Sequence, residues 1–124
     1  MFSTAPSPGH AELTARQLRT AREAEGARTA LRRNAEGLRA ALAHAGLNLV
    51  PGSFGPIVSV LLGENRRATE AAARLRALGI LAHAVRPPTV PAGSARLRLT
   101  VKATFSDADI ARLSGAVEEA CRAS

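Results

Sequence analysis

A chain of 124 residues has the size of one domain and excludes a protein with two complete catalytic lobes, because compact domains usually contain about 100 to 150 residues. Hydrophobic residues make up 46% of the chain but aromatic residues only 2%, so the core must be aliphatic, and an aromatic stacking platform for single-stranded nucleic acid is not expected. The net charge of +7 allows an anionic partner. However, a GC-rich genome also produces an arginine- and alanine-rich composition in which Lys102 is the only lysine, so nucleic acid is not the favoured partner.

The cysteine content and the hydropathy of the chain indicate its cellular compartment and whether it can hold a disulfide or a zinc ion. Cys121 is the only cysteine, so no internal disulfide can form, and no group of cysteine and histidine residues has the spacing of a zinc site. The first residues lack the apolar core of a signal peptide, and no stretch approaches the about 18 apolar residues of a membrane span. We therefore expect a soluble cytoplasmic protein with no metal site and no membrane partner.

The chain opens with a connecting segment, residues 1–9, whose prolines and glycine oppose a helix. From about His10 to Ala45 there is no proline, and alanine, leucine, arginine and glutamate dominate, which predicts one long helix or two stacked helices. Gly46 is well placed to end this helical region. An apolar stripe is clear only in the second half of the region, at Leu31, Leu38, Leu42 and Ala45.

Three later segments predict strands. The apolar run at residues 57–62 suits a strand better than a helix. Residues 80–86 alternate well enough for a second strand, and residues 96–101 alternate strictly between apolar and polar side chains. Between these two strands, the prolines of residues 87–93 predict a rigid loop. The polar face of the third strand carries Arg96, Arg98 and Thr100.

Two further helices complete the chain. Asn65 is placed to cap the first of them, which is expected to run to Leu78 and to stop at Gly79. Ser106 and Asp109 have the spacing of a capping box at the start of the last helix. The apolar positions of this last helix are Ile110, Leu113 and Val117.

The order helix, strand, helix, strand, strand, helix predicts an α+β fold with two layers. In that fold a sheet of about three strands carries helices on one face only, together with the long N-terminal helix. We expect the uncovered face, which includes Arg98, to belong to a larger assembly or to a ligand site.

The most informative chemistry lies around the proline-rich loop. Arg86 precedes the loop and Arg98 follows it, and two guanidinium groups on rigid backbone suit recognition of a carboxylate or phosphate through paired hydrogen bonds. Thr89 offers one hydroxyl in an otherwise apolar turn. From periodicity alone, the favoured interpretation is that Arg96 and Arg98 form the solvated face of an amphipathic strand.

The run from Val85 to Thr100, VRPPTVPAGSARLRLT, closely resembles the C-terminal domain of the α-oxoamine synthases, above all the 8-amino-7-oxononanoate synthases of biotin biosynthesis. The opening FSTA of residues 2–5 is similar to a segment that follows the large domain in that family. The resemblance implies the small domain of the aspartate-aminotransferase fold. It also implies a pyridoxal-phosphate enzyme that condenses an amino acid, with alanine favoured, and an acyl thioester with loss of carbon dioxide.

The resemblance also implies roles for particular residues. Arg98 corresponds to the arginine that binds the carboxylate of the amino acid, Thr89 to a threonine that contacts the substrate, and Arg86 to an arginine that helps to hold it. Ser3 and Thr4 correspond to residues that approach the cofactor phosphate of the neighbouring subunit.

The sequence departs from the family pattern in the residues of the reaction itself. The family forms its Schiff base with a lysine of the large domain, whereas Lys102 follows the RLRLT block and is expected to be a solvated strand lysine. Phe105 stands where the family usually has a histidine. No catalytic residue is therefore assigned to this chain, and we do not expect it to be active alone.

Residues 10–124 would accordingly supply the substrate-binding half of a synthase. The partner would be a large cofactor-binding domain or a homodimeric synthase, with the small domain encoded alone by gene splitting, truncation or a misassigned start codon. The alternative is a non-catalytic interaction or regulatory module that pairs with a full-length paralogue.

Overall fold

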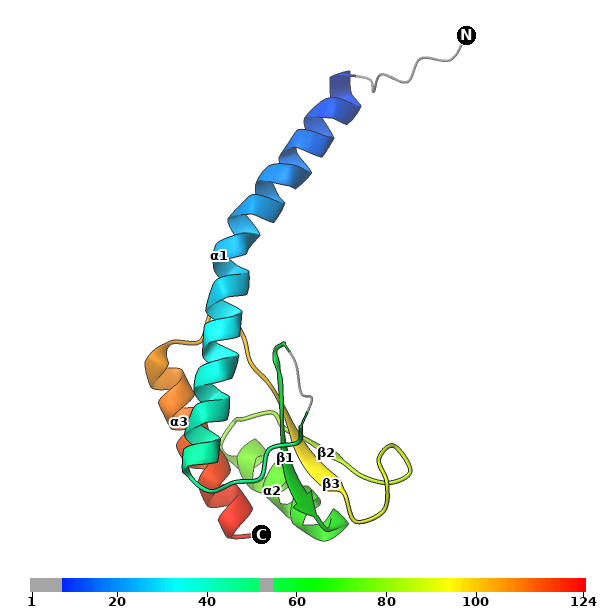
Figure 1. Cartoon of the computed structure of the whole chain (residues 1–124), viewed down its shortest axis with the longest axis vertical. Helices are drawn as coiled ribbons and strands as arrows, with labels where there is room; N and C mark the ends of the chain where they lie inside the picture. Colours follow the sequence, from blue (N-terminus) through cyan, green and yellow to red (C-terminus); the bar gives the residue numbers. More distant parts are fainter. Residues whose placement is uncertain (1–7, 52–54) are drawn as a thin grey trace.

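The computed structural model of the chain describes residues 8–51 and 55–124 and confirms the predicted α+β class and element order. Three helices alternate with the strands of one antiparallel sheet (Figure 1). In chain order the elements are α1 (Pro8–His44), β1 (Ile57–Gly63), α2 (Asn65–Ala77), β2 (His83–Val85), β3 (Ala95–Thr100) and α3 (Asp107–Arg122).

The helix α1 is a single helix of 37 residues, so the stacked pair left open by the sequence is not formed. Its N-terminal half projects away from the rest of the molecule, and Leu13 and Leu18 in this half are exposed (Figure 1). Its C-terminal half packs against α3 and β1 through the fully buried Leu38 and Leu42. The helix ends as predicted, because Gly46 adopts a φ of 82°, which favours glycine.

The sheet has the strand order β1-β3-β2, with antiparallel pairing on both sides of β3. The second strand is shorter than predicted and covers only 83–85 of the expected 80–86. The backbone N–H of Ile80 donates to the carbonyl of Leu75, 2.9 Å away, so the start of the expected strand is tied to the end of α2 instead.

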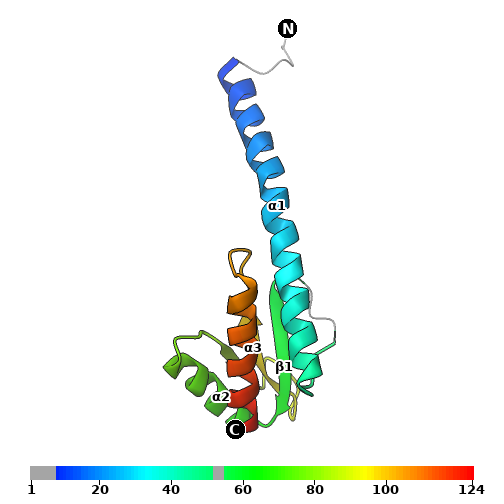
Figure 2. The same cartoon turned by 90° about the vertical axis from the view of Figure 1, so that its left-hand side faces the viewer.

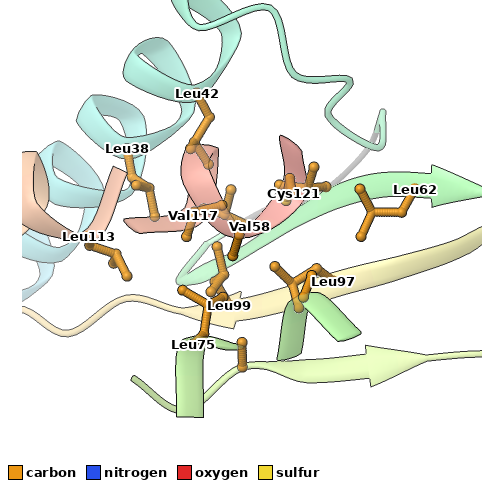
Figure 3. Packing of buried hydrophobic residues seen from close by; sticks show 14 of the residues in the cluster. Leu38, Leu42, Val58, Leu62, Leu75, Leu97, Leu99, Leu113, Val117 and Cys121 are labelled. Carbon is orange, nitrogen blue, oxygen red and sulfur yellow. The ribbon is translucent and has the colours of Figure 1, made fainter. Parts of the chain in front are cut away.

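The three helices lie on one face of the sheet, and the core fills the space between these two layers (Figure 2). Leu97 and Leu99 of β3 point into this space, where Val58, Leu75 and Val117 surround them (Figure 3). The alternation along β3 is therefore as predicted: Leu97 and Leu99 are buried, whereas Arg98 and Thr100 are exposed on the uncovered face.

The caps of the two later helices differ from each other. Ser106 and Asp109 form the predicted capping box, in which the Ser106 hydroxyl accepts from the Asp109 N–H at 3.1 Å and the Asp109 carboxylate accepts from the Ser106 N–H at 2.8 Å. These hydrogen bonds lower the pKa of Asp109. The expectation for Asn65 was wrong: it is the first residue of α2, Glu64 occupies the cap, and no side chain caps this helix.

Burial of Cys121 leads to a testable prediction. Burial raises the pKa of its thiol from the ordinary 9.0 to about 11, and the nearby Arg67 guanidinium opposes this shift only in part. The folded protein should therefore resist alkylation by iodoacetamide at pH 8, and urea should expose the thiol. Because the unfolded state releases the proton first, the free energy of unfolding should fall as the pH rises from 9.0 to about 11.

The control for this prediction is Cys121→Ala, which removes the titrating group. Urea denaturation of both proteins across this pH range isolates the contribution of the thiol. An equal loss of stability in the two proteins would contradict the prediction.

Candidate functional site

The uncovered face of the sheet presents a row of polar side chains across all three strands. Arg98 of β3 pairs directly with Ser59 of β1 on one side and with His83 of β2 on the other. Directly paired residues point to the same face of a sheet, so these three side chains lie next to one another. Arg98 and His83 are exposed, whereas Ser59 is 7% exposed.

Arg98 provides a fixed cation that the described part of the chain leaves unpaired. Its backbone is held by strands on both sides, and its guanidinium makes no hydrogen bond or ion pair with any residue described here. A guanidinium presents a planar set of donors that matches a carboxylate through two parallel hydrogen bonds. The open face can therefore receive a carboxylate at Arg98 without first breaking a contact within the chain.

Arg96 belongs to the same strand but has a different environment. It is partly buried, and its Nε donates to the carbonyl of Ser94 at 3.2 Å. Its terminal nitrogen also lies 3.4 Å from the Ser94 hydroxyl. Arg96 thus braces the end of the proline-rich loop, and of the two strand arginines only Arg98 is left free for a ligand.

The loop that carries Thr89 is held by its own backbone. The Thr89 N–H donates to the carbonyl of Arg86 at 3.1 Å, and the Ser94 N–H donates to that of Pro91 at 3.1 Å. The Pro87–Pro88 peptide bond is cis. The side chain of Thr89 is exposed, as a substrate contact requires.

Arg86 lies on a different side of the sheet from Arg98. It lines a shallow groove of about 320 Å³ with residues of α2, among them Ala72 and Arg76. Ala84, two residues before Arg86, pairs with the buried Leu97 and therefore lies on the face of the sheet that the helices cover. Continued alternation places Arg86 on this same face. The structure therefore does not bring the two predicted arginines onto one face, although β2 is an edge strand and Arg86 lies near that edge.

Sequence analysis did not identify His83 as a neighbour of Arg98. The two residues are 15 positions apart, and only the register of β2 on β3 brings them together. The alternation of residues 80–86 could have placed His83 on one face, but not opposite a particular arginine.

Residues in the described ranges do not form a cofactor site by themselves. In the family that the sequence resembles, the pyridoxal-phosphate site requires a lysine, and Lys102 is the only lysine of the chain. It is exposed, in the turn after β3. Ser3 and Thr4, predicted to approach the cofactor phosphate, lie outside the described residues, so their role stays a prediction.

Residues 8–51 and 55–124 also bear on a metal site and a membrane span. This part of the chain holds no group of three or more histidine, cysteine, aspartate or glutamate side chains that could bind a metal ion. None of its helices is both long enough and apolar enough to span a membrane.

Comparison with known proteins identifies the class to which this arrangement belongs. The chain belongs to the aminotransferase class I and II family, whose family model matches residues 1–117. Within that family, the curated relatives that it matches include 8-amino-7-oxononanoate synthases, which confirms the resemblance expected from the sequence. The relative from Stutzerimonas stutzeri is 42% identical over 119 residues, and that from Methylococcus capsulatus is 42% identical over 122 residues.

These alignments cover nearly all of this chain but only part of each relative. They span 96% and 97% of the chain, and 30% and 31% of the two relatives. The chain thus spans about three-tenths of the length of these curated relatives.

Solved structures show the same relationship. Serine palmitoyltransferase from Sphingomonas wittichii superposes with a TM-score of 0.78 at 27% identity, covering 99% of this chain and 31% of that one. The enzyme from S. paucimobilis, solved with a bound pyridoxal phosphate–myriocin aldimine, gives a TM-score of 0.76 at 27% identity with the same coverage. An 8-amino-7-oxononanoate synthase from Francisella tularensis shares the fold, with a TM-score of 0.73 at 20% identity.

Proposed function

We propose that this chain is the substrate-carboxylate-binding part of a pyridoxal-phosphate-dependent α-oxoamine synthase of the 8-amino-7-oxononanoate type. The complete synthase would condense an amino acid, with alanine favoured, and an acyl thioester with loss of carbon dioxide. The observation that carries the proposal is the unpaired guanidinium of Arg98, held on the central strand of the sheet and facing away from the core.

In this proposal Arg98 binds the carboxylate of the amino acid through two parallel hydrogen bonds. Such a contact fixes the orientation of the substrate as well as its position, which favours a reaction that removes the same carboxylate. Thr89 would donate its hydroxyl to the substrate from the proline-rich loop. Arg86 would approach from the edge of β2 and help to hold the substrate there.

The remaining chemistry would come from a large cofactor-binding domain. Pyridoxal phosphate, when bound by a synthase, supplies the electron sink for the carbanion formed at the α-carbon. The residues described for this chain do not fit a site for that cofactor. Since the chain spans about three-tenths of its curated relatives, the activity would be a property of the whole assembly.

A chimeric enzyme tests the proposal. In the S. stutzeri synthase, the 119-residue region that matches this chain would be replaced by this chain. The proposal expects a folded chimera that binds pyridoxal phosphate and releases carbon dioxide from alanine when an acyl thioester is added. A chimera that folds and binds the cofactor normally but is inactive would contradict it.

A second experiment separates this proposal from a regulatory module. The isolated chain would be mixed with the unaltered S. stutzeri synthase, which already contains its own matching region. Stable co-purification with a change in activity would favour the regulatory alternative, whereas the main proposal expects no complex.

The isolated chain should not form a covalent adduct with the cofactor. Lys102 is exposed and so lacks the desolvation that activates a Schiff-base lysine, and added pyridoxal phosphate should therefore give no saturable absorbance change. Titration of wild-type protein and Lys102→Ala by absorption spectroscopy checks this. A stoichiometric signal that Lys102→Ala abolishes would show that the chain binds the cofactor unaided.

A further inference from the structure

A second cavity lies where the C-terminal end of β3 meets the end of α2 and the first turns of α3. Its volume is about 450 Å³, within the range of about 300–1,000 Å³ that is usual for small-molecule pockets. Its lining combines apolar and basic side chains, of which the important ones are Ile80, Leu81, Leu99, Phe105, Lys102 and Arg112. No step of the proposed function uses this cavity.

One wall of the cavity is held in place by a buried side chain. Asn34 of α1 is 2% exposed, and its Nδ2 donates to the carbonyl of Lys102 at 3.1 Å and to that of Phe105 at 2.9 Å. The Phe105 N–H also donates to the carbonyl of Lys102 at 3.2 Å. The turn that brings Lys102 and Phe105 to the cavity is therefore held by the side chain of Asn34 and by a hydrogen bond within its own backbone.

The rim exposes apolar surface. Leu81, which lines the cavity, is 66% exposed, and Leu78, just before the lining residue Gly79, is 53% exposed. Leu81 has the largest exposed fraction among the exposed large hydrophobic residues described. Exposure of large apolar side chains next to a cavity is unfavourable in water, and a bound apolar group would relieve it.

The charge at the rim is positive. Lys102 makes no ion pair with the residues described, and Arg112 lies close enough to Asp109 to lower the pKa of that carboxyl. Asp109 also lines the cavity, but its carboxylate already accepts the Ser106 N–H of the capping box. The group best placed to receive a new anion is therefore the ammonium of Lys102, and Arg112 lines the same cavity.

We propose that this cavity is a binding site for a medium-chain carboxylate. The hydrocarbon chain would lie against Leu81, Leu99 and Phe105, and the carboxylate would meet Lys102 and Arg112. Arg98 does not line this cavity, although its neighbour His83 does. The proposal can be tested on the isolated chain whether or not that chain belongs to a synthase.

The test is an NMR titration of the full 124-residue chain with octanoate, octan-1-ol and acetate. We expect saturable shifts of the Leu81 and Leu99 methyl signals with octanoate, and binding at least tenfold weaker for octan-1-ol and for acetate. Lys102→Gln should weaken octanoate about tenfold and leave octan-1-ol unchanged, since one charge-assisted hydrogen bond accounts for a factor of this size.

Two further variants complete the design. Leu81→Ser changes an exposed residue, so the fold should persist, and it should weaken octanoate and octan-1-ol alike. Arg19→Gln, on the projecting part of α1, is the matched charge control and should change neither. No saturable shift at millimolar octanoate, equal affinity for octanoate and octan-1-ol, or full octanoate affinity in Lys102→Gln would each overturn the proposal.

Discussion

Leu97→Ala should lower the free energy of unfolding by about 3 to 4 kcal/mol, as expected for truncation of a fully buried leucine. Leu97 is 0% exposed and lies on the central strand, between the sheet and the helices that cover it (Figure 3). Truncation removes apolar contacts and leaves a cavity that rigid neighbours on both sides cannot refill. Urea denaturation followed by circular dichroism measures the change.

Leu13→Ala is the matched control, because it makes the same chemical change at a position that is 51% exposed on the projecting half of α1. It should alter the free energy of unfolding by less than about 0.5 kcal/mol. Similar losses in the two variants would mean that the core does not lie between the sheet and the helices.

Arg98→Ala should lower kcat/KM for the amino acid by about 100-fold in the active chimera, through a higher KM for alanine. The loss corresponds to about 2.7 kcal/mol, the size expected for a charge-assisted contact to a carboxylate. Arg98→Lys should recover only part of this loss, since lysine keeps the charge but not the planar pair of donors. Steady-state kinetics at saturating acyl thioester measure both effects.

Arg74→Ala is the control for charge, because Arg74 is exposed on α2, away from the uncovered face of the sheet. It should leave the KM for alanine unchanged. An Arg98→Ala chimera that keeps its KM for alanine would show that the carboxylate is bound elsewhere.

Local signals predicted most of the fold. The capping box of Ser106 and Asp109 and the positive φ at Gly46 depend on neighbours within a few residues, so both could be predicted from the sequence. The first residues of the expected strand 80–86 were misassigned because a contact of Ile80 with the preceding helix competes with strand pairing.

The candidate site could be predicted only in part. The strict alternation of the third strand placed Arg98 on the open face, but its neighbours Ser59 and His83 are set by the register of three strands, which no local pattern encodes. The separation of Arg86 from Arg98 has the same origin. The cavity at the end of β3 depends on Asn34, which reaches residues 68 to 71 positions away.

The continuity of α1 also has a mechanical consequence. The helix runs without a break from Pro8 to the buried Leu38 and Leu42, so its projecting part is a stiff arm attached to the sheet and the helices that cover it. From Pro8 to Leu31 this arm measures about 35 Å, at a rise of about 1.5 Å per residue. A rotation of only about 10° at Leu31, which packs against the core, would displace Pro8 by about 6 Å. The packing of Leu38 and Leu42 against the core therefore determines the direction in which the N-terminal half of α1 projects.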